Sequence, residues 1–214
     1  MYKNLIAAAA ISAVAGTAQA ASITFDYTGV GGGAAPTAQT VDGITATVSG
    51  LKCAAGGCDP VGVQQWFNGL GIKAKNGWRD HDSHQVDGYN GDDIVVFAFS
   101  EAVRIISASF SYVDPNDDVT LFSVSGTSVT AGEKGRIGVD GPFSGGAGNG
   151  GDTGSYTFAG LFEGETFGFG AVDAYDNWKL ASVTVESIAA VPLPAAGWML
   201  LAGLGGLAAM RRRR

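Results

Sequence analysis

Apolar and polar residues alternate along much of this chain, and the alternation predicts β-strands. The segment 103–113 shows it best, because Ile106, Ala108, Phe110 and Tyr112 are separated by serines. A period of two is typical of a half-buried antiparallel strand, with one face toward a core and the other toward water. No stretch of the body shows a clean helical stripe. Further strands are predicted at 22–28, 43–48, 93–100, 119–124, 155–158, 166–172 and 179–187, with weaker patterns at 69–74, 125–133 and 136–139.

Short strands separated by turns predict an all-β fold. Asp114-Pro115-Asn116-Asp117 has the composition of a turn between two such strands. In the last strand, Leu180 breaks the phase shared by Ala181, Val183 and Val185, which predicts a β-bulge. The expected architecture is an antiparallel β-sandwich of the jelly-roll type. The lack of an obvious internal repeat argues against a solenoid or a propeller.

The beginning of the chain has the pattern of an export signal. Lys3 precedes an apolar stretch at 5–15, and Ala18-Gln19-Ala20 fits the small-residue pattern of a cleavage site. The apolar stretch is short for a transmembrane helix and ends in small residues. We therefore predict a signal peptide with its signal helix over residues 1–20 and a mature chain that begins near Ala21.

The end of the chain has the pattern of a transmembrane helix. Residues 195–210 carry no charge, and four arginines at 211–214 follow. The uncharged residues alone would reach about 24 Å as a helix, and a helix that begins at Val191 is long enough to cross a hydrocarbon core of about 30 Å. The arginines are costly to move through lipid and hold the C-terminus on the cytoplasmic side. An ordinary membrane anchor is one interpretation, and the order of the tail favours a second one over it.

The order of this tail also resembles a sorting signal. The motif Val191-Pro192-Leu193-Pro194-Ala195, an apolar helix and a terminal run of arginines are similar to the VPLPA-CTERM variant of the PEP-CTERM signal. The resemblance covers residues 191–214. It implies recognition by an exosortase, a membrane-embedded, cysteine-protease-like transpeptidase of Gram-negative bacteria, which cuts near the motif and releases or re-anchors the protein at the cell surface. The predicted domains are then 1–20, 21–190 and 191–214.

The charge of the body differs from that of the whole chain. The formal net charge is −7, but all 20 acidic residues lie between the two targeting segments, where only 8 basic residues accompany them, so the body carries −12. Such a surface repels nucleic acid and anionic lipid and attracts cations, so no nucleic-acid partner is expected. Fifteen of the acids are Asp, a residue that favours turns and short-reach oxygen ligation.

The two cysteines lie close together, in Cys53-Ala-Ala-Gly-Gly-Cys58. An exported protein meets an oxidising compartment, and the glycines let the spacer bend back, so we predict a disulfide that closes a small loop. A metal pair or a redox pair is the alternative. Two thiols without further cysteine or histidine ligands make a poor zinc site, and the spacing is not that of a C-x-x-C redox motif.

Acidic turns are the strongest candidate for a binding site. Carboxylates and amide oxygens at strand ends are the ligands of Ca²⁺, which takes six to eight oxygens. The alternative is that Asp, Asn and Gly are simply good turn formers. The segment 173–178 also resembles the approach to the closing strand of carbohydrate-binding-like jelly rolls, which implies a structural cation near Asp176. The candidate Ca²⁺ ligands are Asp114, Asp117, Asp118, Asp173, Asp176 and Asn177.

Other candidate residues lie in the irregular segment 61–90. Trp78 and Tyr89 could form an aromatic platform for a sugar, or they could be ordinary rim aromatics. His81 and His84, three residues apart and next to carboxylates, could hold a metal or act as a general base, although a solvated loop is the simpler interpretation. The string Asp152-Thr153-Gly154-Ser155 matches that of aspartic proteases, but it lacks the second copy that their chemistry requires.

These patterns predict a non-enzymatic β-sandwich protein that is exported through the inner membrane, anchored there transiently, and then placed at the cell surface or in the extracellular matrix. The expected partners are the exosortase, the membrane through the C-terminal helix before processing, and an exopolysaccharide or another surface glycan. The first alternative is a calcium-assisted carbohydrate-binding module. A glycan-active hydrolase built around His81 and His84 is the second.

Overall fold

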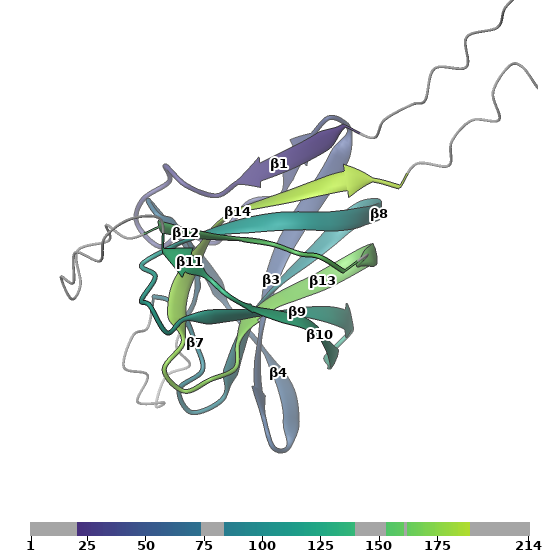
Figure 1. Cartoon of the computed structure of the whole chain (residues 1–214). Helices are drawn as coiled ribbons and strands as arrows, with labels where there is room; N and C mark the ends of the chain where they lie inside the picture. Colours follow the sequence, from purple (N-terminus) through teal and green to yellow (C-terminus); the bar gives the residue numbers. More distant parts are fainter. Residues whose placement is uncertain (1–20, 74–83, 140–152, 161, 189–214) are drawn as a thin grey trace, which may run out of the picture. The chain divides into compact units, whose positions relative to one another are not determined.

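The computed structural model describes residues 21–73, 84–139, 153–160 and 162–188 (Figure 1). These residues are all-β, and every strand pairing among them is antiparallel, as the alternation predicts. No helix in this part of the chain is long and apolar enough to cross a membrane. The signal peptide and the sorting tail lie outside the described residues, so their helices stay predictions. The strands are β1 (Ser22–Asp26), β2 (Gln39–Val41), β3 (Ile44–Ala54), β4 (Gly57–Val61), β5 (Val63–Trp66), β6 (Gly69–Ile72), β7 (Val86–Asp87), β8 (Asp92–Ser111), β9 (Asp118–Ser125), β10 (Ser128–Arg136), β11 (Gly138–Val139), β12 (Thr153–Thr157), β13 (Glu163–Ala171) and β14 (Asn177–Ser187).

The long strand β8 organises the other strands. Its first half pairs with β3 and β13, and its second half pairs with β14 and β12. The prediction of two separate strands at 93–100 and 103–113 is therefore wrong. The exposed step Ser100-Glu101-Ala102 contains no glycine or proline that would turn the chain. The strand continues through this step while its partners change.

The pairings form two groups of strands that are joined through β8. The first group consists of β13, β9 and β10, which follow one another beside the first half of β8. The second group lies beside the second half of β8, where β1 extends it by pairing with β14. One core cluster draws aromatic rings from both groups. The Phe97 ring meets Tyr27 and Phe169 edge-on, with centroids 5.5 and 5.6 Å apart, and all three are fully buried. This arrangement is consistent with a β-sandwich.

A second, smaller core lies on the other face of the strands around β8. It consists of Leu51, Cys53, Ile94, Val96 and Phe122. β13 alternates phenylalanine with glycine, so that Phe167 and Phe169 enter the main core while Gly168 and Gly170 face the small one. A Cβ at Gly168 would lie only 2.6 Å from the Ile94 Cγ2. The two glycines therefore allow the small core to pack directly against the strand backbone.

The predicted disulfide between Cys53 and Cys58 is confirmed, but its setting differs from the expected loop. The two cysteines lie directly opposite each other on β3 and β4, which form a hairpin closed at Ala55-Gly56. The sequence analysis did not predict β4. Its Pro60 cannot donate to a central ladder, which matches a strand whose only partner is β3.

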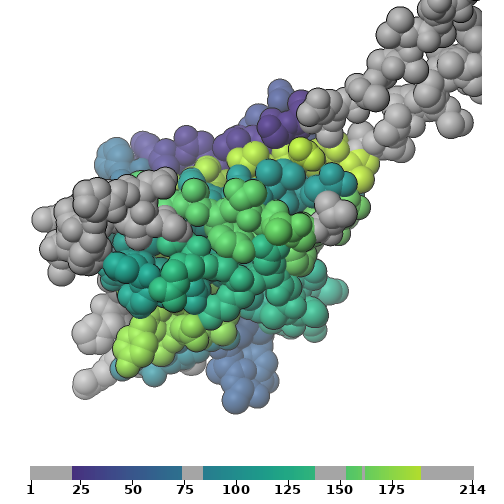
Figure 2. Space-filling model, viewed as in Figure 1, coloured from purple at the N-terminus to yellow at the C-terminus, as the bar shows by residue number. Residues whose placement is uncertain are grey.

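β14 connects the two ends of the domain. β1 pairs with its last half, with Ser22 opposite Glu186, so the first and last described strands meet at one edge. β14 begins at Asn177, directly after an acidic turn, and its length places that turn about 30 Å from this edge. Figure 2 shows the yellow-green of this segment on the surface at both places. The bulge predicted at Leu180 is confirmed by a shift of register against β8 between Leu180 and Ser182.

Candidate functional site

Two acidic turns of the same pattern face each other at the start of β9 and β14. The first turn (residues 114–118) and the second turn (residues 173–177) both contain two aspartates three positions apart. In the first, the Asp117 N–H donates to the Asp114 carbonyl at 3.1 Å, and the Asp117 carboxylate accepts from the Asp114 N–H at 2.6 Å. Asp173 and Asp176 repeat both bonds at 2.9 and 3.0 Å. The aspartate that ends each pattern therefore closes its own turn.

The same two aspartates also join the turns to each other. The Asp176 carboxylate accepts from the Asp118 N–H at 2.9 Å, and the Asp117 carboxylate accepts from the Asn177 N–H at 3.1 Å. Asp117 and Asp176 are 0% and 2% exposed, so these bonds replace water on carboxylates that have lost it. Each of the four oxygens accepts one backbone N–H. We call this arrangement the twin turn.

Burial sets the acidity of these carboxylates. It raises the pKa of Asp117 to about 7, against the opposing effect of the hydrogen bonds from Asp114 and Asn177. Burial also raises the pKa of Asp176, against the bonds from Asp118 and Asp173. Underneath, the buried Trp178 ring donates its indole N–H to the Asp118 carbonyl at 3.0 Å.

Three carboxylates of the twin turn could hold a metal ion. Asp118, Asp173 and Asp176 each offer one oxygen, and these oxygens lie within 4.8 Å of one another. The structure thus brings together three of the six predicted Ca²⁺ ligands. Asp117 uses both oxygens on backbone N–H groups. Asn177 directs its side-chain N–H to the Tyr175 carbonyl at 3.4 Å. Asp114 belongs to the first turn but not to this group of three, and binding of Ca²⁺ stays a prediction.

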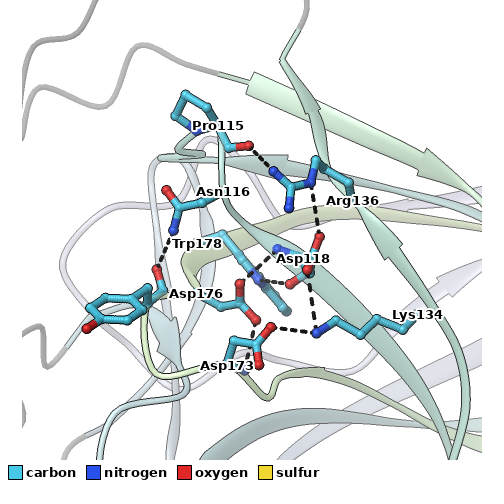
Figure 3. Close-up of polar contacts among 9 residues, drawn as sticks. Pro115, Asn116, Asp118, Lys134, Arg136, Asp173, Asp176 and Trp178 are labelled. Carbon is cyan, nitrogen blue, oxygen red and sulfur yellow. Dashed lines mark hydrogen bonds and ion pairs between the residues drawn. The ribbon is translucent and has the colours of Figure 1, made fainter.

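Two basic side chains of β10 reach the same carboxylates, as Figure 3 shows. The Lys134 Nζ lies 2.6 Å from the Asp173 carboxylate and 3.5 Å from that of Asp118. The Arg136 Nε lies 3.5 Å from Asp118. The hydrogen bond to Asp173 raises the pKa of Lys134, so its ammonium stays charged. A metal ion at this place must compete with that ammonium.

The sequence analysis missed Lys134 and Arg136 because they are distant in the chain from both turns. Their positions could have been inferred only from the hairpin register, in which Lys134 lies opposite Thr120 and Arg136 lies opposite Asp118.

A third acidic turn, residues 87–93, packs on the second one. Asp87 pairs with Asn177, and the Gly88 N–H donates to the Asp176 carbonyl at 3.2 Å. Below it, the Lys52 Nζ lies 2.9 Å from the buried Asp93 carboxylate. Burial raises the pKa of the nearby Asp92 carboxyl. The charge of Lys52 opposes this shift, and the charge of Asp173 adds to it. Three acidic turns therefore meet at one end of the domain.

The other predicted site residues fall into two groups. Trp78, His81 and Asp152 lie outside the described residues, as does the sorting motif at 191–195, so these predictions stay open. Of the rest, His84 stacks on Trp66 with ring centroids 4.6 Å apart, and Tyr89 is 43% exposed.

The most exposed large apolar side chain of the described residues was not predicted. It is Tyr175, 80% exposed, in the middle of the second turn. Its place between Asp173 and Asp176 was the available signal, since the middle of a tight turn is directed away from the core.

No protein-family model, curated protein or solved structure matches the chain.

Proposed function

We propose that this chain is an exported, non-enzymatic surface protein with a jelly-roll-like β-sandwich domain, sorted by an exosortase at Val191–Ala195 and associated with the extracellular matrix. The observation that carries this proposal is the pair of targeting patterns on either side of one acidic β domain. The disulfide is in keeping with an oxidising compartment.

Cell fractionation of two variants tests the sorting. Deletion of residues 191–214 should leave the protein in the periplasm, without membrane association and absent from the cell surface. Scrambling Val191–Ala195 while keeping the apolar helix and the arginines should leave an uncleaved protein in the inner membrane. Replacement of the exposed Asp59 by Asn is the matched control and should leave sorting unchanged. If the scrambled variant and the natural chain behave alike, both cleaved or both left uncleaved in the inner membrane, the motif does not direct sorting and the proposal is wrong.

The three-carboxylate group of the twin turn favours a second candidate, a calcium-assisted carbohydrate-binding module. In this reading Asp118, Asp173 and Asp176 hold the ion, which stabilises the turns that carry Tyr89 and Tyr175. Calcium titration followed by thermal unfolding tests it: Ca²⁺ should raise the Tm of the natural chain and of Asp59→Asn, but not of Asp118→Asn. An equal response of all three proteins would mean general screening of negative charge.

A further inference from the structure

Three exposed apolar side chains lie on the second and third acidic turns or directly before them: Tyr89, Val172 and Tyr175. We call them the apolar ridge. These side chains are 43%, 37% and 80% exposed. The ladder pairs Asp87 with Asn177, and the bond from Gly88 to Asp176 extends it by one step. Tyr89 and Tyr175 are the next residues on the two segments, so each lies one residue beyond this contact.

The backbone beneath Tyr175 is firmly held although its ring is exposed. The Tyr175 carbonyl accepts from the side-chain amides of Asn116 and Asn177 at 3.3 and 3.4 Å. Residues 173 and 176, on either side, are bonded to each other through both backbone and carboxylate. An aromatic side chain on a pre-ordered backbone loses little further entropy when it binds a ligand.

The charge around the ridge is negative. The three acidic turns contain eight aspartates, and within the described part of the chain the basic side chains that pair with them include Lys52, Lys134 and Arg136. Four of the eight are buried, and the other four, Asp92, Asp114, Asp118 and Asp173, are exposed or partly exposed. Asp114 is exposed, and it lies on the turn whose Asn116 contacts Tyr175. A polyanionic ligand would be repelled here, whereas a ligand that carries ammonium groups would be attracted.

We propose that this ridge binds a polysaccharide with free amino groups, that is, a polymer of amino sugars that are at least partly unacetylated. The tyrosine rings would pack on the apolar faces of the pyranose rings, and the ammonium groups would lie near Asp114 and over the ring faces. The ridge lies beside the start of β14, whereas β1 pairs with the second half of that strand. This inference rests on the proposed surface location, which supplies contact with such polymers.

Binding measurements on the full-length chain in mild detergent test this inference. The probes are a short β-1,4-linked glucosamine oligomer, its N-acetylated counterpart and an oligogalacturonate. The glucosamine oligomer should bind more tightly than the N-acetylated oligomer or the oligogalacturonate, by a factor of roughly ten or more. Tyr175→Ala should weaken this binding on the order of tenfold, and Asp114→Asn should weaken it several-fold. Tyr175→Ala should fold normally, because both hydrogen bonds at Tyr175 use its carbonyl.

Matched controls separate the ridge from general attraction. Phe67→Ala removes another exposed ring, 68% exposed on the loop after β5, and Asp59→Asn removes another exposed carboxylate. Neither should change the affinity. Equal weakening by Tyr175→Ala and Phe67→Ala, equal binding of the N-acetylated oligomer, or no binding of any oligomer would each overturn the proposal. None of these results bears on sorting, which the fractionation experiment tests separately.

Discussion

A buried carboxylate is costly unless its oxygens accept hydrogen bonds, and Asp117 and Asp176 meet that condition with backbone N–H groups alone. A metal ion at Asp176 would share an oxygen that also accepts a backbone N–H, which the second lone pair of that oxygen allows. The role of Asp117 and Asp176 is to fix the two turns to each other. The carboxylates of Asp118 and Asp173, in contrast, contact side chains of β10 and remain partly exposed.

Asp117→Asn should destabilise the domain although it changes only one atom. An amide nitrogen cannot accept a hydrogen bond, so the N–H of Asp114 or of Asn177 loses its partner in a buried place. An unsatisfied buried donor costs roughly 1–3 kcal/mol. Urea unfolding should show this loss in the midpoint with an unchanged m-value, and the exposed Asp59→Asn should show none. An unchanged midpoint in Asp117→Asn would mean that the twin turn does not depend on this carboxylate.

The raised pKa of Asp117 makes a prediction about pH. In the unfolded chain this carboxyl titrates near 3.8, and in the folded chain near 7. Between these values the folded state holds a proton that the unfolded state has lost, so the contribution of Asp117 to stability falls as pH rises from about 4 to 7. The free energy of unfolding of the natural chain should therefore decline more over this range than that of Asp117→Asn. Parallel pH profiles would contradict the shift.

The strands show how far the pattern of residues can predict this fold. Alternation located most strands, and the phase break at Leu180 located a bulge, because both depend on neighbours in the chain. Alternation did not predict that β8 runs unbroken through Ser100–Ala102. Exposed residues of this kind occur both in turns and in a strand whose neighbouring strands change along its length. The place of Lys134 beside Asp173 depends on pairing between distant strands, which periodicity does not contain. The acidic turns could be found from sequence, but their joining could not.

The small core on the far face of β13 leads to a prediction for one strand. Gly168→Ala should destabilise the domain by roughly 1–3 kcal/mol, because the new Cβ would lie 2.6 Å from Ile94 and 3.1 Å from Val124. Gly56→Ala, in the β3–β4 hairpin, is the control, since a Cβ there meets no atom within 4 Å. Thermal unfolding of both variants measures the difference. Equal Tm values would mean that the small core can relax around a methyl group.

At the scale of the whole molecule, the domain has two different ends. One is the edge where β1 meets the end of β14, next to the sorting tail in sequence. The other carries the three acidic turns, the exposed tyrosines and the two basic side chains from β10. β14 connects the two ends, since the second acidic turn precedes its first residue and Ser187 is its last. The sorting proposal does not depend on the acidic end, whereas the glycan proposal rests on the surface location that sorting would supply.

The balance of charge at the acidic end gives the last prediction. Lys134→Met keeps the length of the side chain but leaves Asp118 and Asp173 without the ammonium that now lies between them. The variant should be less stable than the natural chain at low ionic strength, by about 1 kcal/mol for a pair that is partly exposed, and added salt should reduce the difference. It should also bind Ca²⁺ more tightly, since the ion no longer competes with a fixed cation.

Arg136→Met is the control, because the Arg136 side chain is 63% exposed and contacts Asp118 only at 3.5 Å, so its effects should be smaller. Calcium titration and thermal unfolding of both variants decide the matter: if Lys134→Met is neither destabilised nor more responsive to Ca²⁺ than Arg136→Met, the group of three carboxylates is not a cation site.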